Sequence, residues 1–117
     1  MIEIKISRDF SVIPGGRTMA EGNFSGEEFR DTILMRKYCE AEEQDTQLLI
    51  NFDDCYGIGT SFLEEAFGGL VRVYHKHGVM DRIIIVATED ETIPENIKRF
   101  VEDAEAEEKK RYEQTTG

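Results

Sequence analysis

The chain has 117 residues, which suits one domain with its own hydrophobic core. Hydrophobic residues make up 39% and charged residues 33%, a balance typical of a globular protein rather than a disordered one. The net charge of -11 and the scattered basic residues argue against nucleic acid and against an anionic membrane surface as partners.

The N-terminal residues 1–10 lack the apolar stretch of a signal peptide. No apolar run in the chain approaches the roughly 18 residues that a membrane helix requires. We therefore expect a cytoplasmic protein without a membrane segment. Cys39 and Cys55 have no CxxC partner, so we interpret them as reduced, small hydrophobic residues and expect no metal site.

The first third of the chain predicts a strand, a turn and a helix. Residues 2–6 alternate apolar and polar side chains, as a half-buried strand does. The PGGR sequence at residues 14–17 indicates a turn, for example within a hairpin. Ser25 and Glu28 form a capping-box pattern, and Phe24 and Phe29 take the positions of a hydrophobic staple, so a helix is expected to begin at Ser25.

The rest of the chain predicts two further strands and two helices. Residues 48–52 form a short apolar run, typical of a strand at the centre of a sheet or buried on both faces. A capping-box pattern predicts a second helix from Ser61 to about Gly78, and residues 82–87 give the strongest strand signal. Thr92 is the expected cap of a third helix. That helix has an apolar stripe of Ile93, Ile97, Val101 and Ala104.

This order predicts a single α/β domain over residues 1–117, with residues 105–117 as a charged C-terminal extension. Strand–helix–strand units require parallel neighbouring strands with right-handed crossovers. Together with the expected hairpin, the pattern indicates a mixed sheet of four to five strands with helices packed on it. Binding sites in such sheets lie at the carboxyl ends of strands, where residues 53–61 are expected.

The loop of residues 53–61 ends in two hydroxyls, Thr60 and Ser61, at the start of the second helix. A hydroxyl there caps the helix, and the same helix end favours a phosphoryl group, either bound or covalent. A nucleotide-binding loop is not favoured. Gly57 and Gly59 begin a GxGxxG pattern, but Phe62 occupies the third glycine position, and no lysine precedes Thr60.

No catalytic arrangement stands out, and we expect no enzyme. Glu64 and Glu65 lie in the first turn of the predicted helix, where capping and the helix dipole account for them. His75 and His77 are two residues apart and point to different faces of a helix.

The pair Gly68 and Gly69 lies inside the predicted second helix, where each glycine costs roughly 1 kcal/mol relative to alanine. The absence of a side chain allows close approach of the helix backbone to another element. The sheet and a partner protein lying on the helix are the two alternatives.

The strand, loop and helix of residues 48–72 resemble the STAS domain, the fold of bacterial anti-sigma-factor antagonists. In that fold a buried strand leads to a loop ending in Asp-Ser-Ser-Gly, or a threonine variant, at the start of a helix. More specifically, the chain is similar to a STAS-like family of unknown function. The sequences that carry this similarity are PGGR at 14–17, SGEEFR at 25–30 and TSFLEEAFGGLVR at 60–72.

The resemblance implies a non-enzymatic switch. The antagonist binds a GHKL-type kinase that is also an anti-sigma factor, and the kinase phosphorylates the loop hydroxyl. Phosphorylation breaks the complex because a dianion enters an interface fitted to a neutral hydroxyl. By position, Thr60 and Ser61 are the candidate hydroxyls, and Gly57 and Gly59 shape the loop. Gly59 stands where the STAS motif has aspartate, and Phe62 where it has glycine.

The PGGR and SGEEFR sequences are not part of ordinary STAS domains and suggest a second function. Their arginines, Arg17 and Arg30, are expected to pair with the loop acids Asp53 or Asp54.

We therefore predict a STAS-like protein-interaction module without a cofactor, switched by phosphorylation, whose partner is by resemblance a GHKL-type ATPase or kinase. The alternative is a small-ligand or nucleotide sensor that uses residues 57–61 and Arg17. The predicted phosphorylation and interaction loop comprises Thr60, Ser61, Gly57, Gly59 and Asp54. The predicted interaction surface comprises Phe62, Glu64, Glu65, Gly68, Gly69 and Arg17.

Overall fold

The computed structural model describes residues 1–116, and the side chains of residues 1–114. Within these residues, three parallel strands form one sheet in the order β1-β2-β3. The strands are β1 (Ile2–Lys5), β2 (Leu48–Asn51) and β3 (Ile83–Val86). The apolar strand β2 lies at the centre, as its sequence predicts. The expected α/β fold is confirmed.

The expectation of a mixed sheet with four to five strands is wrong, because the described residues contain three strands and all are parallel. The PGGR segment does not pair with a strand. The carbonyl groups of Gly16 and Arg17 instead accept hydrogen bonds from the N–H groups of Gly26 and Glu27, at 2.9 and 3.0 Å. The first N–H groups of a helix have no partner within the helix, so PGGR supplies the acceptors that this helix end lacks.

Two long helices each contain a central wide turn. The first runs without a break through α2 (Gly26–Phe29), the wide turn η2 (Arg30–Leu34) and α3 (Met35–Glu43). The second runs through α4 (Thr60–Leu63), the wide turn η3 (Glu64–Gly68) and α5 (Gly69–Arg72). The shorter elements and the C-terminal helix are α1 (Ile6–Asp9), η1 (Met19–Glu21), α6 (Val79–Arg82) and α7 (Thr92–Thr116).

The predicted start of the first long helix is confirmed. The Ser25 hydroxyl accepts a hydrogen bond from the Glu28 N–H at 3.1 Å. The Glu28 carboxylate reaches back to the N–H of Phe24, also at 3.1 Å. The predicted staple is formed through a third ring, since Phe10 packs on Phe24 and on Phe29, with centroids 5.4 and 5.3 Å apart.

The second long helix ends at Arg72, earlier than the expected end near Gly78. The chain leaves the helix because His75 takes a left-handed conformation, with φ of 56°. The N–H groups of His75 and Lys76 then bond back to the carbonyls of Val71 and Leu70. Gly78 is instead the N-cap of the short helix α6, also with a positive φ.

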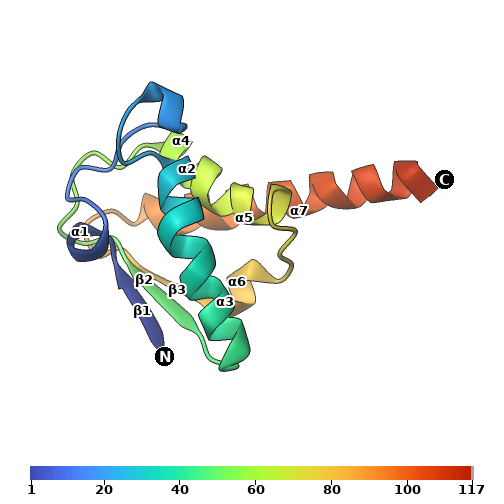
Figure 1. Cartoon of the computed structure of the whole chain (residues 1–117), viewed down its shortest axis with the longest axis horizontal. Helices are drawn as coiled ribbons and strands as arrows, with labels where there is room; N and C mark the ends of the chain where they lie inside the picture. Colours follow the sequence, from blue (N-terminus) through green and yellow to red (C-terminus); the bar gives the residue numbers. More distant parts are fainter. Residues whose placement is uncertain (117) are drawn as a thin grey trace.

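The core lies on one face of the sheet. Aligned residues on that face, such as Ile4 and Ile50, are fully buried. On the opposite face, Leu49, Asn51 and Ile84 remain partly exposed, so the sheet carries helices on one side. Figure 1 shows the long helices gathered beside the sheet, with the loop before α4 at the same end as the start of α2.

Helix α7 projects well beyond the body of the molecule (Figure 1). Its predicted stripe of Ile93, Ile97, Val101 and Ala104 is buried, whereas the charged extension continues as helix to Thr116. Gly117, the last residue of the expected extension, lies outside the described residues.

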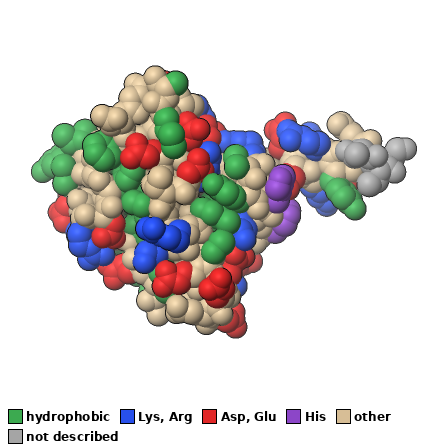
Figure 2. All heavy atoms as spheres, viewed as in Figure 1, with side chains coloured by type: hydrophobic (Ala, Val, Ile, Leu, Met, Phe, Trp, Pro, Cys, Tyr) green, Lys and Arg blue, Asp and Glu red, His purple; other side chains and the backbone are tan. Residues whose placement is uncertain are grey.

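Thr92 is not the cap of α7, because Asp90 accepts hydrogen bonds from the Thr92 N–H and hydroxyl, at 3.0 and 2.6 Å. Figure 2 shows the histidines where the projection meets the body.

The contact between the two long helices predicts a sensitive glycine. A Cβ atom on Gly26 would lie 2.4 Å from the carbonyl oxygen of Phe62, which is backbone and has little room to move. We expect Gly26→Ala to lower the free energy of unfolding by about 1–3 kcal/mol, measured by urea denaturation. Gly16→Ala is the matched control, since its Cβ would meet only the flexible Glu21 carboxylate, at 3.3 Å. Equal stability of the two variants would contradict the close packing.

Candidate functional site

The loop between β2 and α4 begins with a side-chain turn. The Asn51 side-chain oxygen accepts a hydrogen bond from the Asp53 N–H at 2.9 Å, directly after the strand. Asp54 and Gly57 both have left-handed backbones, with φ of 71° and 64°. Gly57 is suited to this conformation because it has no Cβ. The loop therefore leaves the carboxyl end of the central strand, where the sequence places it.

Neither predicted hydroxyl caps the second long helix. The N-cap residue is Gly59, and no side chain caps this helix end. Thr60 and Ser61 lie inside the first turn and are exposed. Within the described residues, neither hydroxyl makes a side-chain hydrogen bond. The expectation of a capping role for Ser61 is therefore wrong, because the helix begins at Thr60 and places Ser61 second in its first turn, past the N-cap position.

A pocket of about 240 Å³ lies beside the loop, at the carboxyl ends of β2 and β3. Phe52 and Ile93 in its lining are almost fully buried. The complete lining is Phe52, Asp53, Cys55, Tyr56, Gly57, Ile58, Ala87, Glu89, Asp90 and Ile93. The pocket thus combines an apolar floor with three carboxylates.

The loop acids are held by neighbours other than the predicted arginines. Asp53 accepts hydrogen bonds from the Thr88 hydroxyl at 2.7 Å and from the Glu89 N–H at 3.3 Å. The hydrogen bond from Thr88 lowers the pKa of Asp53 most. Asp54 pairs with Lys5 at 3.0 Å. The expected pairing of the loop acids with Arg17 or Arg30 is therefore wrong.

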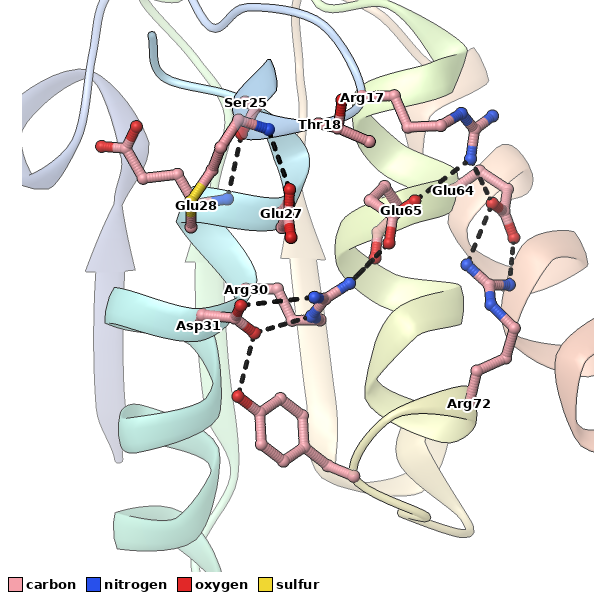
Figure 3. Close-up of polar contacts among 12 residues, drawn as sticks. Arg17, Thr18, Ser25, Glu27, Glu28, Arg30, Asp31, Glu64, Glu65 and Arg72 are labelled. Atoms are coloured by element: carbon pink, nitrogen blue, oxygen red, sulfur yellow. Dashed lines mark hydrogen bonds and ion pairs between the residues drawn. The ribbon is translucent and has the colours of Figure 1, made fainter. Parts of the chain in front are cut away.

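The two predicted arginines contact the second long helix instead. Arg17 Nη1 lies 2.6 Å from Glu64 Oε1 and 3.5 Å from Glu65 Oε1. Arg72 binds the same Glu64 through two nitrogens, at 2.5 and 3.1 Å. Figure 3 shows Arg17 and Arg72 approaching the Glu64 carboxylate from opposite sides. Glu64 is thus held between an arginine of the PGGR loop and one of its own helix.

Arg30 is the most buried charged side chain of this cluster, with a residue exposure of 4%. Its guanidinium bonds to Glu65 Oε2 at 2.6 Å, to the Glu65 carbonyl at 3.2 Å and to Asp31 at 2.8 Å (Figure 3). Tyr74 donates its hydroxyl to Asp31 at 2.9 Å. Arg30 belongs to the wide turn η2 and Glu65 to the wide turn η3, so these two turns face each other across the ion pair. Wide turns of this kind occur often at functional sites.

The two glycines of the second helix make room for these arginines. A Cβ on Gly69 would lie 2.6 Å from Arg30 Nη1, and one on Gly68 would lie 2.8 Å from Arg72 Nη1. Gly68 and Gly69 are buried, as is Phe62. These three residues therefore do not belong to an exposed interaction surface, contrary to the expectation. Of that predicted surface, Glu64, Glu65 and Arg17 remain partly exposed.

Sequence reasoning missed Arg72, Asp31 and Tyr74. A usable signal exists for Arg72, which follows Glu64 by eight residues, about two helical turns, with Gly68 between them on the same face. No local signal marks Tyr74, because it lies 43 residues from Asp31 and meets it only through the fold.

In the part of the chain that the structure describes, no group of three or more His, Cys, Asp or Glu side chains is arranged to hold a metal ion. No helix among these residues has the length and apolar character needed to cross a membrane.

Comparison with known proteins assigns part of the chain to a family. Residues 25–92 match the model of a family described as "STAS-like domain of unknown function (DUF4325)". The match includes SGEEFR and TSFLEEAFGGLVR and leaves PGGR outside. No curated protein and no solved structure matches significantly.

The buried ion pair yields a stability prediction. Arg30→Ala leaves Glu65, whose side chain is 18% exposed, without its closest cation. Breaking a buried pair from one side costs about 3–5 kcal/mol, so we expect a loss near the lower end of that range. Arg8→Ala, which removes an exposed pair with Asp9, is the control and is expected to cost much less, because solvent weakens exposed ion pairs. Urea denaturation measures both, and similar losses would refute a structural role of Arg30.

The cluster also predicts a stability loss in acid. Burial raises the pKa of Glu64, but hydrogen bonds from Arg72 and Arg17 outweigh it and hold the pKa below the ordinary 4.5. A pKa that is lower in the folded than in the unfolded state stabilises the fold above the unfolded value. This contribution disappears as the pH falls through the folded value. We therefore expect the free energy of unfolding to decrease below pH 4.5, and Glu64→Gln to flatten this decrease.

The control for the acid experiment is Glu43→Gln, which removes an exposed carboxylate. This variant should follow the pH profile of the unchanged protein. If Glu64→Gln does so as well, the ion pairs of Glu64 do not contribute to acid stability.

Proposed function

The chain belongs to the STAS-like domain family of unknown function, and from this membership and the loop geometry we propose that it is a non-enzymatic protein-interaction module. The observation that carries the proposal concerns Thr60 and Ser61. Both are exposed in the first helical turn, and within the described residues neither side chain makes a hydrogen bond. A capping role would have explained the presence of these hydroxyls by the stability of the helix alone. Without that role, they are free to meet a partner or a modifying enzyme.

The position of the hydroxyls supports the same role. They follow the central strand at its carboxyl end, where binding sites of parallel sheets gather. The loop leading to them is exposed at Tyr56, with 71% of that residue accessible. By resemblance, the partner is a GHKL-type ATPase or kinase that phosphorylates Thr60 or Ser61.

Phosphorylation would act on the arginine cluster through charge. A phosphoryl group adds almost two negative charges at neutral pH. Thr60 precedes Glu64 by four residues, so the two side chains share one face of the helix. A phosphate on Thr60 would repel Glu64 and compete with it for Arg17, which is 38% exposed and comes from a loop. The modification thereby alters both the loop and the PGGR segment.

The alternative of a nucleotide or small anionic ligand is less well supported. Arg17, its expected phosphate contact, is bound to Glu64 and Glu65. The pocket beside the loop is lined by Asp53, Glu89 and Asp90 and by no basic residue, so it would repel a phosphate.

Mass spectrometry of the protein purified from its own host tests the proposed switch. We expect a single phosphoryl addition that maps to Thr60 or Ser61 and is absent from the Thr60→Ala/Ser61→Ala variant. Thr32→Ala is the control, since Thr32 is also exposed but donates a hydrogen bond to the Glu28 carbonyl and does not line the pocket beside the loop. This variant should keep the modification.

An unmodified mass under all growth conditions would exclude phosphorylation at the loop. Affinity capture with the unchanged protein, the double variant and the control then tests whether a partner binds through the loop, independently of phosphorylation. A partner retained by the unchanged protein and the control, and lost by the double variant, supports binding through the loop. Equal capture by all three proteins contradicts it.

A further inference from the structure

The pocket beside the loop is too small for most independent ligands. Its volume of about 240 Å³ lies below the range of about 300–1,000 Å³ that small-molecule sites occupy. It is open to one side chain of a larger molecule. The loop residues Gly57 and Ile58, which line it, lead directly to Gly59 and Thr60, so the exposed hydroxyls follow the pocket lining within a few residues of the chain.

The negative charge of the pocket favours a cationic side chain as its occupant. Asp53 and Glu89 contribute carboxylates from two different loops, and Asp90 adds a third. Asp54 and Glu91 adjoin them in the sequence. Lys5 is the basic residue that pairs with Asp54, and its charge also acts on Asp53, so the acids of this region outnumber it. Hydrogen bonds from Thr88 and Thr92 lower the pKa of Asp53 and of Asp90, so both are charged at neutral pH.

The apolar lining of the pocket further limits which cationic side chain fits. Phe52 and Ile93 form a buried floor, with Ile58 and Ala87 beside it, and the exposed ring of Tyr56 lies in the wall. A side chain with an apolar stem and a cationic end matches this distribution. Arginine fits better than lysine, because its planar guanidinium bonds carboxylates from two directions and stacks on an aromatic ring.

We propose that this pocket receives an arginine side chain of the protein partner that binds the Thr60-Ser61 loop. The inference rests on the proposed interaction function and adds the chemistry of the partner: a basic residue flanked by apolar ones. Binding of the arginine anchors the partner beside the hydroxyls, so a phosphoryl group on either of them would stand next to the interface.

A peptide titration followed by NMR tests the pocket. The probe is acetyl-Gly-Leu-Arg-Leu-Gly-amide, added to the full chain at 150 mM salt. We expect saturable shifts of the backbone amides of Gly57, Ile58 and Ala87. A second peptide replaces arginine by citrulline, which keeps the size and loses the charge. We expect it to bind at least about fivefold more weakly, because it lacks charge-assisted hydrogen bonds.

Two variants locate the binding. Asp53→Asn/Glu89→Gln removes two charges from the pocket and keeps one acceptor oxygen at each position, which preserves one of the two hydrogen bonds to residue 53 and the bond from the Asp54 N–H to residue 89. The double variant should weaken binding of the arginine peptide at least about fivefold. The matched control Glu42→Gln/Asp81→Asn removes two charges from the pocket lined by Tyr38 and Arg82, and should bind as the unchanged chain does. Ala87→Leu, which fills the pocket without a charge change, should also abolish binding.

Each other outcome overturns the inference. If both double variants weaken binding of the arginine peptide equally, the peptide is attracted to the acidic protein in general. If the citrulline peptide binds as tightly as the arginine peptide, the pocket does not recognise the charge. Unchanged binding to Ala87→Leu places the peptide elsewhere. The proposed function is tested separately by phosphosite mapping and capture. Peptide binding without any modification or partner would leave an arginine-selective pocket but remove the partner and the switch, and the reverse result would remove only the pocket inference.

Discussion

The buried guanidinium of Arg30 is the constraint on which the arrangement of the two long helices depends. An arginine with 4% exposure is stable only with its charge and its donors satisfied, and Glu65 and Asp31 provide both. The helices therefore have to keep Arg30 and Glu65 in contact. Gly26 allows the first helix to lie against Phe62, and Gly69 leaves space for the guanidinium.

The same cluster explains why three separated sequence motifs belong together. PGGR provides Arg17, SGEEFR provides Arg30, and the long motif of the second helix provides Glu64, Glu65 and Arg72. Each arginine of the cluster bonds at least one of the two glutamates. PGGR lies outside the part of the chain that matches the family model, yet its backbone caps the first helix and its arginine joins the cluster.

Charge divides the surface around the loop into two parts. The arginines pair with Glu64 and Glu65 on the second long helix, whereas the pocket beside the loop is lined by three acids and by no basic residue. The exposed hydroxyls of Thr60 and Ser61 lie between these parts in the sequence. This arrangement supports a partner with a basic side chain at the pocket and a switch that acts through Arg17.

The sequence by itself determined the order of strands and helices, the cap at Ser25, the buried stripe of α7 and the position of the loop, because these depend on periodicity and on neighbours within a few residues. Tertiary structure alone decided the number of strands, the partners of Arg17 and Arg30, and the absence of a cap at Ser61. Arg17 and Glu64 are 47 residues apart, and Arg30 and Glu65 are 35 apart. Local patterns carry no information on which distant charge is nearest. Ser61 and Glu64 satisfied the local rule for a capping box, but the helix begins at Thr60, and the fold brings two arginines to the Glu64 carboxylate.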